Sequence, residues 1–125
     1  MKVNRFSIPI YDYDVIYIEL HSDDSVEEQI AIITEELTLM KTNEQYLDET
    51  IQEIKDGSKN GGNHFYNLSK SVSLIMIYPH DDPDRLRATI AHEKRHLEDR
   101  MLKHYRVKDI ESAGLLAGYL SKFIH

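Results

Sequence analysis

The chain has 125 residues, of which 41% are hydrophobic and 30% charged, and this composition predicts a single domain, residues 1–125. Its 15 lysine and arginine residues against 22 aspartate and glutamate residues give a net charge of −7, which argues against nucleic acid or an anionic membrane surface as a partner. Because the chain has no cysteine, disulfides, thiol catalysis and thiolate metal sites are excluded. The first 20 residues match neither a signal peptide nor a membrane span, so we expect a cytoplasmic protein.

Four segments rich in β-branched and aromatic residues predict strands. The first two, residues 6–10 and 15–20, flank a polar turn at residues 11–14 and predict a hairpin. Residues 64–68 and 71–78 predict two more strands. The last of them carries a continuous apolar run, which indicates burial on both faces.

Capping residues and the helical spacing of apolar residues predict four helices. They are residues 25–40, residues 42–57, a helix that begins at Pro83, and a helix that follows a short connection at residues 105–108. Ser25, Thr42 and Asp82 are the expected N-caps. The glycine-rich segment 57–63 lacks the Lys-Ser/Thr ending of a phosphate-binding loop and is taken as a connector. No internal repeat is found, and the expected fold is α+β, with a mixed sheet of about four strands packed on helices.

The third helix carries the strongest chemical signal, His92-Glu93-Lys94-Arg95-His96, which matches the pattern H-E-x-x-H. Residues four apart lie on one helix face, so His92 and His96 can direct ring nitrogens at one tetrahedral zinc ion. Glu93 is then placed to reach a water bound to the metal and to act as a general base. The alternative is a pair of structural histidines on a helix with a solvated, charged outer face.

A third protein ligand is expected, since two imidazoles do not hold zinc firmly. The downstream candidates are Glu98, Asp99, His104, Asp109, Glu111 and His125. Glu111 is preferred because an antiparallel fourth helix would return it towards the histidines. Gly114 and Gly118 lie near the same helix face and predict a close approach to the third helix, although an ordinary helix crossing with an acidic first turn remains the alternative.

These residues resemble the gluzincin type of zincin metallopeptidase in a minimal form, and the small zincin-like proteins of gut bacteria and their mobile elements. The resemblance covers residues 74–120 and implies zinc held by His92, His96 and Glu111, with Glu93 as general base and acid. Two features depart from the family: Lys94 and Arg95 are charged where peptidases have uncharged residues, and the 29 residues given after His96 are too few for the second subdomain of large members.

The expected function is a zinc-dependent hydrolase, a metallopeptidase that acts on a peptide or protein. A substrate could add as a strand beside the site, along the strand that ends at Tyr78. The alternative is a non-catalytic zincin-like module that binds metal or another protein. Four side chains are candidate oxyanion donors, with ordinary packing as the alternative for each: His80, His104, Tyr105 and Tyr119. The remaining histidines, His21, His64 and His125, are taken as structural or exposed, and no feature indicates an oligomeric state.

Overall fold

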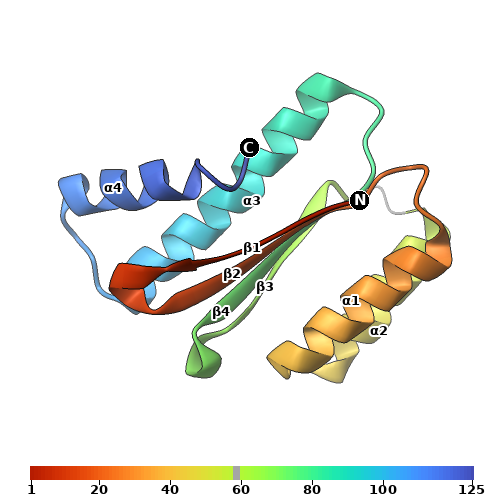
Figure 1. Cartoon of the computed structure of the whole chain (residues 1–125), viewed down its shortest axis with the longest axis horizontal. Helices are drawn as coiled ribbons and strands as arrows, with labels where there is room; N and C mark the ends of the chain where they lie inside the picture. The colour runs from red at the N-terminus through yellow and green to blue at the C-terminus, as the bar shows by residue number, and fades with distance from the viewer. Residues whose placement is uncertain (58–59) are drawn as a thin grey trace.

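The computed structural model describes residues 1–57 and 60–125, which form one four-stranded sheet and four α-helices (Figure 1). The elements are β1 (Lys2–Ile8), β2 (Tyr13–Glu19), α1 (Val26–Met40), α2 (Glu44–Asp56), β3 (Gly62–Asn67), β4 (Val72–Ile77), α3 (Pro83–His104) and α4 (Ile110–Leu120). The strand order is β1-β2-β4-β3. The outer pairs are antiparallel, and the central pair, β2 with β4, is parallel. The predicted α+β class, with its C-terminal helix pair, is confirmed.

Side chains alternate between the two faces of the sheet, and each face has its own hydrophobic core. On β2, Tyr13 and Tyr17 belong to the core under α3 and α4, whereas Ile18 belongs to the core under α1 and α2. Five of the six residues of β4 are buried, which confirms the predicted burial of this strand on both faces. Figure 1 shows the resulting three layers, with α1 and α2 on one side of the sheet and α3 and α4 on the other.

Two of the three predicted N-caps are confirmed. The side chains of Ser25 and Asp82 accept backbone N–H groups at the starts of α1 and α3. The prediction was wrong for α2, which is capped by Asn43. Thr42 instead donates its hydroxyl to the carbonyl of Leu37 at the end of α1. None of the described helices combines the length and the apolar character that a membrane-spanning helix requires.

The first strand lies earlier in the chain than the predicted residues 6–10. β1 covers residues 2–8, and Pro9 begins a short 3₁₀ turn that ends at Tyr11. Proline has no N–H to donate to the strand ladder, so the pairing with β2 stops before it.

The two halves of the chain have the same architecture, although no repeat was found in the sequence. Each half begins with an antiparallel hairpin and continues with two helices. A 3₁₀ turn closes each hairpin and is followed by a residue in the left-handed conformation, Asp12 (φ 49°) in the first half and Ser71 (φ 52°) in the second. Because the central strands are parallel, the repeat places the two helix pairs on opposite faces of the sheet.

Candidate metal centre

The middle of α3 brings His92, Glu93 and His96 together. The four-residue spacing places both imidazoles on one helix face, and their Nε2 atoms lie 2.9 Å apart. One potential ligand atom from each of the three residues lies within 4.8 Å of the others. Among the described residues, no other group of three or more histidine, aspartate or glutamate side chains has ligand atoms so close. The structure therefore assembles three of the four residues predicted for the site.

The donor set of this group suits zinc. Tetrahedral Zn²⁺ takes imidazole nitrogens at about 2.0–2.1 Å, which requires about 3.3 Å between two such nitrogens. The 2.9 Å between the Nε2 atoms of His92 and His96 is close to this value. Both histidines are exposed, so a small rotation of either ring can adjust the distance.

Glu93 lies on the inner side of the motif, towards the sheet. Its side chain is only 6% exposed, in contrast to the two histidines that flank it in the motif. Burial raises the pKa of the Glu93 carboxyl above its usual value, and the charges of His96 and His92 act in the opposite direction. A raised pKa makes this carboxylate a stronger base than an exposed glutamate.

Two glycines allow α3 to pack closely against β3 at this point. A Cβ atom at Gly62 would lie 2.6 Å from the main-chain oxygen of Met76 and 3.2 Å from Cγ of Glu93. A Cβ atom at Gly61 would lie 2.6 Å from Cγ2 of Thr89 on α3. The glycine-rich segment, predicted to be a plain connector, therefore sets how closely α3 packs on the edge of the sheet, while residues 58 and 59 of that segment lie outside the described residues.

Glu111, the predicted third ligand, is not part of the group. It is an exposed residue in the first turn of α4. The C-terminal end of the chain, just after α4, packs beside β1, where Phe123 stacks on Phe6. Glu93 and His96 instead line a pocket with β3, on the opposite flank of α3. The antiparallel return of the fourth helix was predicted to bring Glu111 back to the histidines, and in the structure Glu111 does not join their group.

The close helix contact predicted for Gly114 and Gly118 is also absent. Both glycines are exposed, and a Cβ atom at either would meet no described atom within 4 Å. They line an open groove that α4 forms with the first hairpin. Their spacing was a correct sign of a shared helix face, but that face does not contact α3.

His64, taken from the sequence as structural or exposed, lines the same pocket as His96. Its Nε2 atom lies 2.9 Å from Oγ of Ser73, and this hydroxyl lies 2.7 Å from the hydroxyl of Tyr13. Burial, helped by the nearby His96 and Arg100, lowers the pKa of His64 to about 4, so the ring is neutral at pH 7. The alternation of side chains along a strand could have indicated that His64 faces α3. Its neighbour Phe65 packs in the core on the other face of the sheet.

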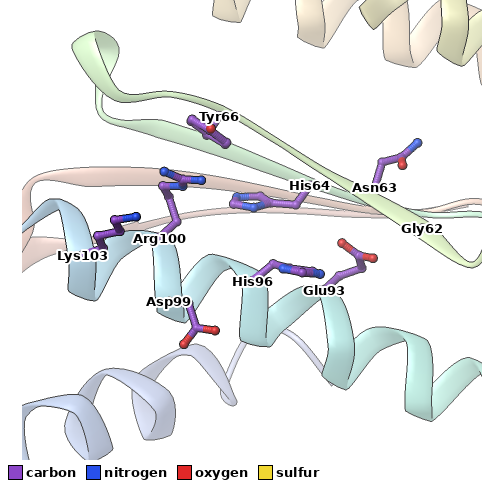
Figure 2. A pocket seen from close by; sticks show the side chains of 9 residues that line it. All are labelled: Gly62, Asn63, His64, Tyr66, Glu93, His96, Asp99, Arg100 and Lys103. Carbon is purple, nitrogen blue, oxygen red and sulfur yellow. The ribbon is translucent and has the colours of Figure 1, made fainter.

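The pocket lies between α3 and β3 and has a volume of about 490 Å³. Figure 2 shows Glu93 and His96 at one end, Arg100 and Lys103 at the other, and His64 between them. β3 is an edge strand, whereas β4 is paired on both sides. The strand that can receive an added peptide beside this pocket is therefore β3, and the expectation that the strand ending at Tyr78 would do so was wrong.

None of the four candidate oxyanion donors lines this pocket. The hydroxyl of Tyr105 donates to the carbonyl of Tyr11, and that of Tyr119 donates to the carbonyl of Ser7. Nδ1 of His80 lies 2.6 Å from the carbonyl oxygen of Tyr78, at the start of the loop before α3. These side chains stabilise the packing of loops and helices.

The structural repeat places Glu36 and Glu93 at equivalent positions, each eleven residues after the N-cap of its helix (36 − 25 and 93 − 82). Arg5 and His64 are also equivalent, each seven residues before the left-handed residue of its hairpin (12 − 5 and 71 − 64). In the first half, buried Glu36 forms an ion pair with Arg5. In the second half, Glu93 forms no ion pair with any lysine or arginine of the described chain. The second half therefore keeps a buried carboxylate without a cationic partner beside two imidazoles.

Comparison of the chain with protein-family models, curated proteins and solved structures finds no match. Function is therefore inferred from the chemistry of the site itself.

Proposed function

We propose that this protein is a zinc-dependent hydrolase, a metallopeptidase in which Glu93 is the general base and acid. The observation that carries the proposal is the assembly of His92, Glu93 and His96, with their ligand atoms within 4.8 Å of one another at the end of a pocket. Further support comes from the repeat. The position of Glu93 is filled in the first half by Glu36, which has a structural ion pair with Arg5, whereas Glu93 has none and is available for proton transfer.

In this proposal the two exposed histidines, His92 and His96, would hold the ion. Zinc bound there would supply Lewis acidity, which lowers the pKa of a coordinated water and polarises the substrate carbonyl. Glu111 is left out of the ligand set, because it lies on a helix that packs against the other flank of α3.

Glu93 carries out the proton transfers. It accepts a proton from the attacking water and later donates that proton to the leaving amine. A general base works best when its pKa lies near the working pH, and burial moves the pKa of Glu93 in that direction. The ligand atoms of Glu93 and the two histidines lie within 4.8 Å of one another, and this closeness supports a role for the carboxylate in proton transfer to and from a water bound at this group.

The test compares Glu93→Gln with wild type on a peptide library, with zinc added and cleavage followed by mass spectrometry. The substitution removes the proton acceptor and keeps the size of the side chain, so we expect hydrolysis to fall by about 10²–10⁴-fold with zinc affinity unchanged. The matched control is Glu98→Gln, which changes another buried acid of α3 that pairs with Lys94 at 3.2 Å and should leave hydrolysis intact.

Two outcomes would contradict the proposal. Hydrolysis retained in Glu93→Gln would remove Glu93 from the chemistry. Zinc binding by wild type without cleavage of any library peptide would instead favour the alternative function, a metal-binding module that is not an enzyme.

A further inference from the structure

We infer that the end of the pocket away from the metal group binds the terminal carboxylate of a peptide substrate, through Arg100, Lys103 and the imidazole of His64. The inference rests on the proposed hydrolase function, because that function supplies the peptide to which the carboxylate belongs. It predicts a peptidase that acts close to the C-terminus of its substrate.

Arg100 is a guanidinium held in place without an acidic partner. Its Cζ atom lies 4.2 Å from the centroid of the Tyr66 ring, an arrangement that fixes the cation by its attraction to the aromatic face. Among the described residues no aspartate or glutamate forms an ion pair with it. Figure 2 shows the guanidinium directed into the pocket, towards His64. A planar guanidinium without a partner matches the bidentate geometry of a carboxylate.

Lys103 adds a second cation at the same end of the pocket. Asp99, one helical turn earlier and also at the edge of the pocket, does not neutralise it, since Asp99 is directed away from β3 (Figure 2) and forms an ion pair with Arg95, whose Nε lies 3.2 Å from Oδ1. Lys103 itself forms no ion pair within the part of the chain that the structure describes. In a chain with a net charge of −7, two unpaired cations that line one cavity indicate an anionic ligand.

The third contribution is the orientation of a proton on His64. Tyr13 and Ser73 are both fully buried, and each hydroxyl proton needs an acceptor. Both protons are accepted only if Tyr13 donates to Ser73 and Ser73 donates to Nε2 of His64, along contacts of 2.7 and 2.9 Å. The neutral ring then carries its proton on Nδ1, for which no described residue is a partner. His64 therefore offers an N–H donor in the wall of the pocket, between Arg100 and the metal group.

The spacing along α3 relates the carboxylate to the bond that is cut. Arg100 follows His96 by one helical turn, a rise of about 6 Å, and Lys103 follows it by about 10 Å. An extended peptide advances about 3.3–3.6 Å per residue. A carboxylate held by these cations therefore lies two or three residues beyond a carbonyl placed at the metal group, which predicts removal of two or three residues from the C-terminus.

The experiment measures peptide binding to metal-free full-length protein by isothermal titration calorimetry, so it does not depend on hydrolysis. The probes are acetyl-Ala-Ala-Ala with a free carboxylate, the same peptide as its C-terminal amide, and inorganic phosphate. We expect the free acid to bind about tenfold or more tightly than the amide, since a charge-assisted hydrogen bond is lost with the carboxylate. Phosphate should bind more weakly than the free acid.

The variants test which residues recognise the carboxylate. We expect the preference for the free acid to be lost in Arg100→Gln and in Arg100→Lys. Lysine keeps the positive charge but lacks the paired N–H donors of the planar guanidinium. Lys103→Gln changes an exposed residue that cannot affect folding strongly and should reduce the preference. The matched control is Arg87→Gln on the same helix, which is 71% exposed, outside the pocket and paired with Asp84. This substitution should leave the preference for the free acid unchanged.

Equal binding of acid and amide, or a preference that survives Arg100→Gln and Lys103→Gln, would overturn the inference, as would tighter binding of phosphate than of the free acid. These results leave the proposed hydrolase untouched, because zinc binding and Glu93 chemistry are measured separately. Conversely, a preserved carboxylate preference in a protein that cuts no peptide would contradict only the proposed function.

Discussion

A methyl group at Gly62 would lie 3.2 Å from Cγ of Glu93 and 2.6 Å from the carbonyl oxygen of Met76. Gly62 therefore lies so close to the backbone of β4, and to Glu93 of α3, that only glycine fits at this position. We expect Gly62→Ala to destabilise the protein by about 2 kcal/mol or more, because the backbone carbonyl on β4 cannot move aside. Urea denaturation measures this loss.

Gly118→Ala is the matched control. Gly118 is a helical residue of α4 at which an added Cβ meets no described atom within 4 Å. Alanine is the better helix former, so we expect a gain of about 0.5–1 kcal/mol in the free energy of unfolding. A loss of stability in Gly118→Ala would mean that α4 packs more closely than described, as the sequence had suggested.

His64 predicts a loss of stability in mild acid. Burial lowers its pKa in the folded protein to about 4, from 6.5 in the unfolded chain, so between these values the unfolded chain binds the proton more tightly. The contribution of neutral His64 to the free energy of unfolding is complete above pH 6.5 and is lost as the pH falls towards 4. From pH 7 to pH 5 we expect a fall of about 2 kcal/mol in the free energy of unfolding, measured without metal.

The same denaturation series on His64→Gln provides the comparison. Glutamine does not titrate, so the difference in stability between pH 7 and pH 5 should shrink by most of that amount. An equal pH dependence in the variant and in wild type would show that His64 is not buried in its neutral form.

The chain of hydrogen bonds from Tyr13 through Ser73 to His64 predicts a single imidazole tautomer. Long-range ¹H–¹⁵N spectra of the histidines should show His64 protonated on Nδ1. Tyr13→Phe keeps the Ser73 donor and should cost about 1 kcal/mol without changing the tautomer. Ser73→Ala leaves two buried polar groups unpaired and should cost more. A ring protonated on Nε2 in wild type would reverse the direction of the chain and remove the N–H donor from the pocket.

Local patterns predicted the elements of this fold well. The caps Ser25 and Asp82, the apolar run of β4 and the first hairpin each depend on residues close together in the chain, and the structure confirms them. The turn of that hairpin lies at residues 9–12, earlier than the predicted residues 11–14. The shift of the α2 cap from Thr42 to Asn43 is an error of one residue between two good capping side chains.

Long-range placement could not be predicted in the same way. The spacing of α4 identified a helix, but the flank of α3 against which it packs depends on the apolar rings of Phe6 and Phe123, which lie far apart in the chain. His64 joined the pocket because β3 is an edge strand next to β4, and this pairing has no local signature. The two halves likewise share an architecture without a repeated sequence pattern. The equivalent positions are held by Arg5 and Glu36 in the first half and by His64 and Glu93 in the second.

The central claim is that His92 and His96 hold a metal ion without Glu111. The most direct measurement is calorimetric titration of metal-free protein with Zn²⁺ for wild type, His92→Ala, His96→Ala and Glu111→Ala. Two imidazoles bind zinc more weakly than three protein ligands do, so titration is preferred to metal content after purification. The account predicts one zinc per chain in wild type and Glu111→Ala with equal affinity, and no binding in either histidine variant. Loss of binding in Glu111→Ala, or binding that survives both histidine variants, would contradict it.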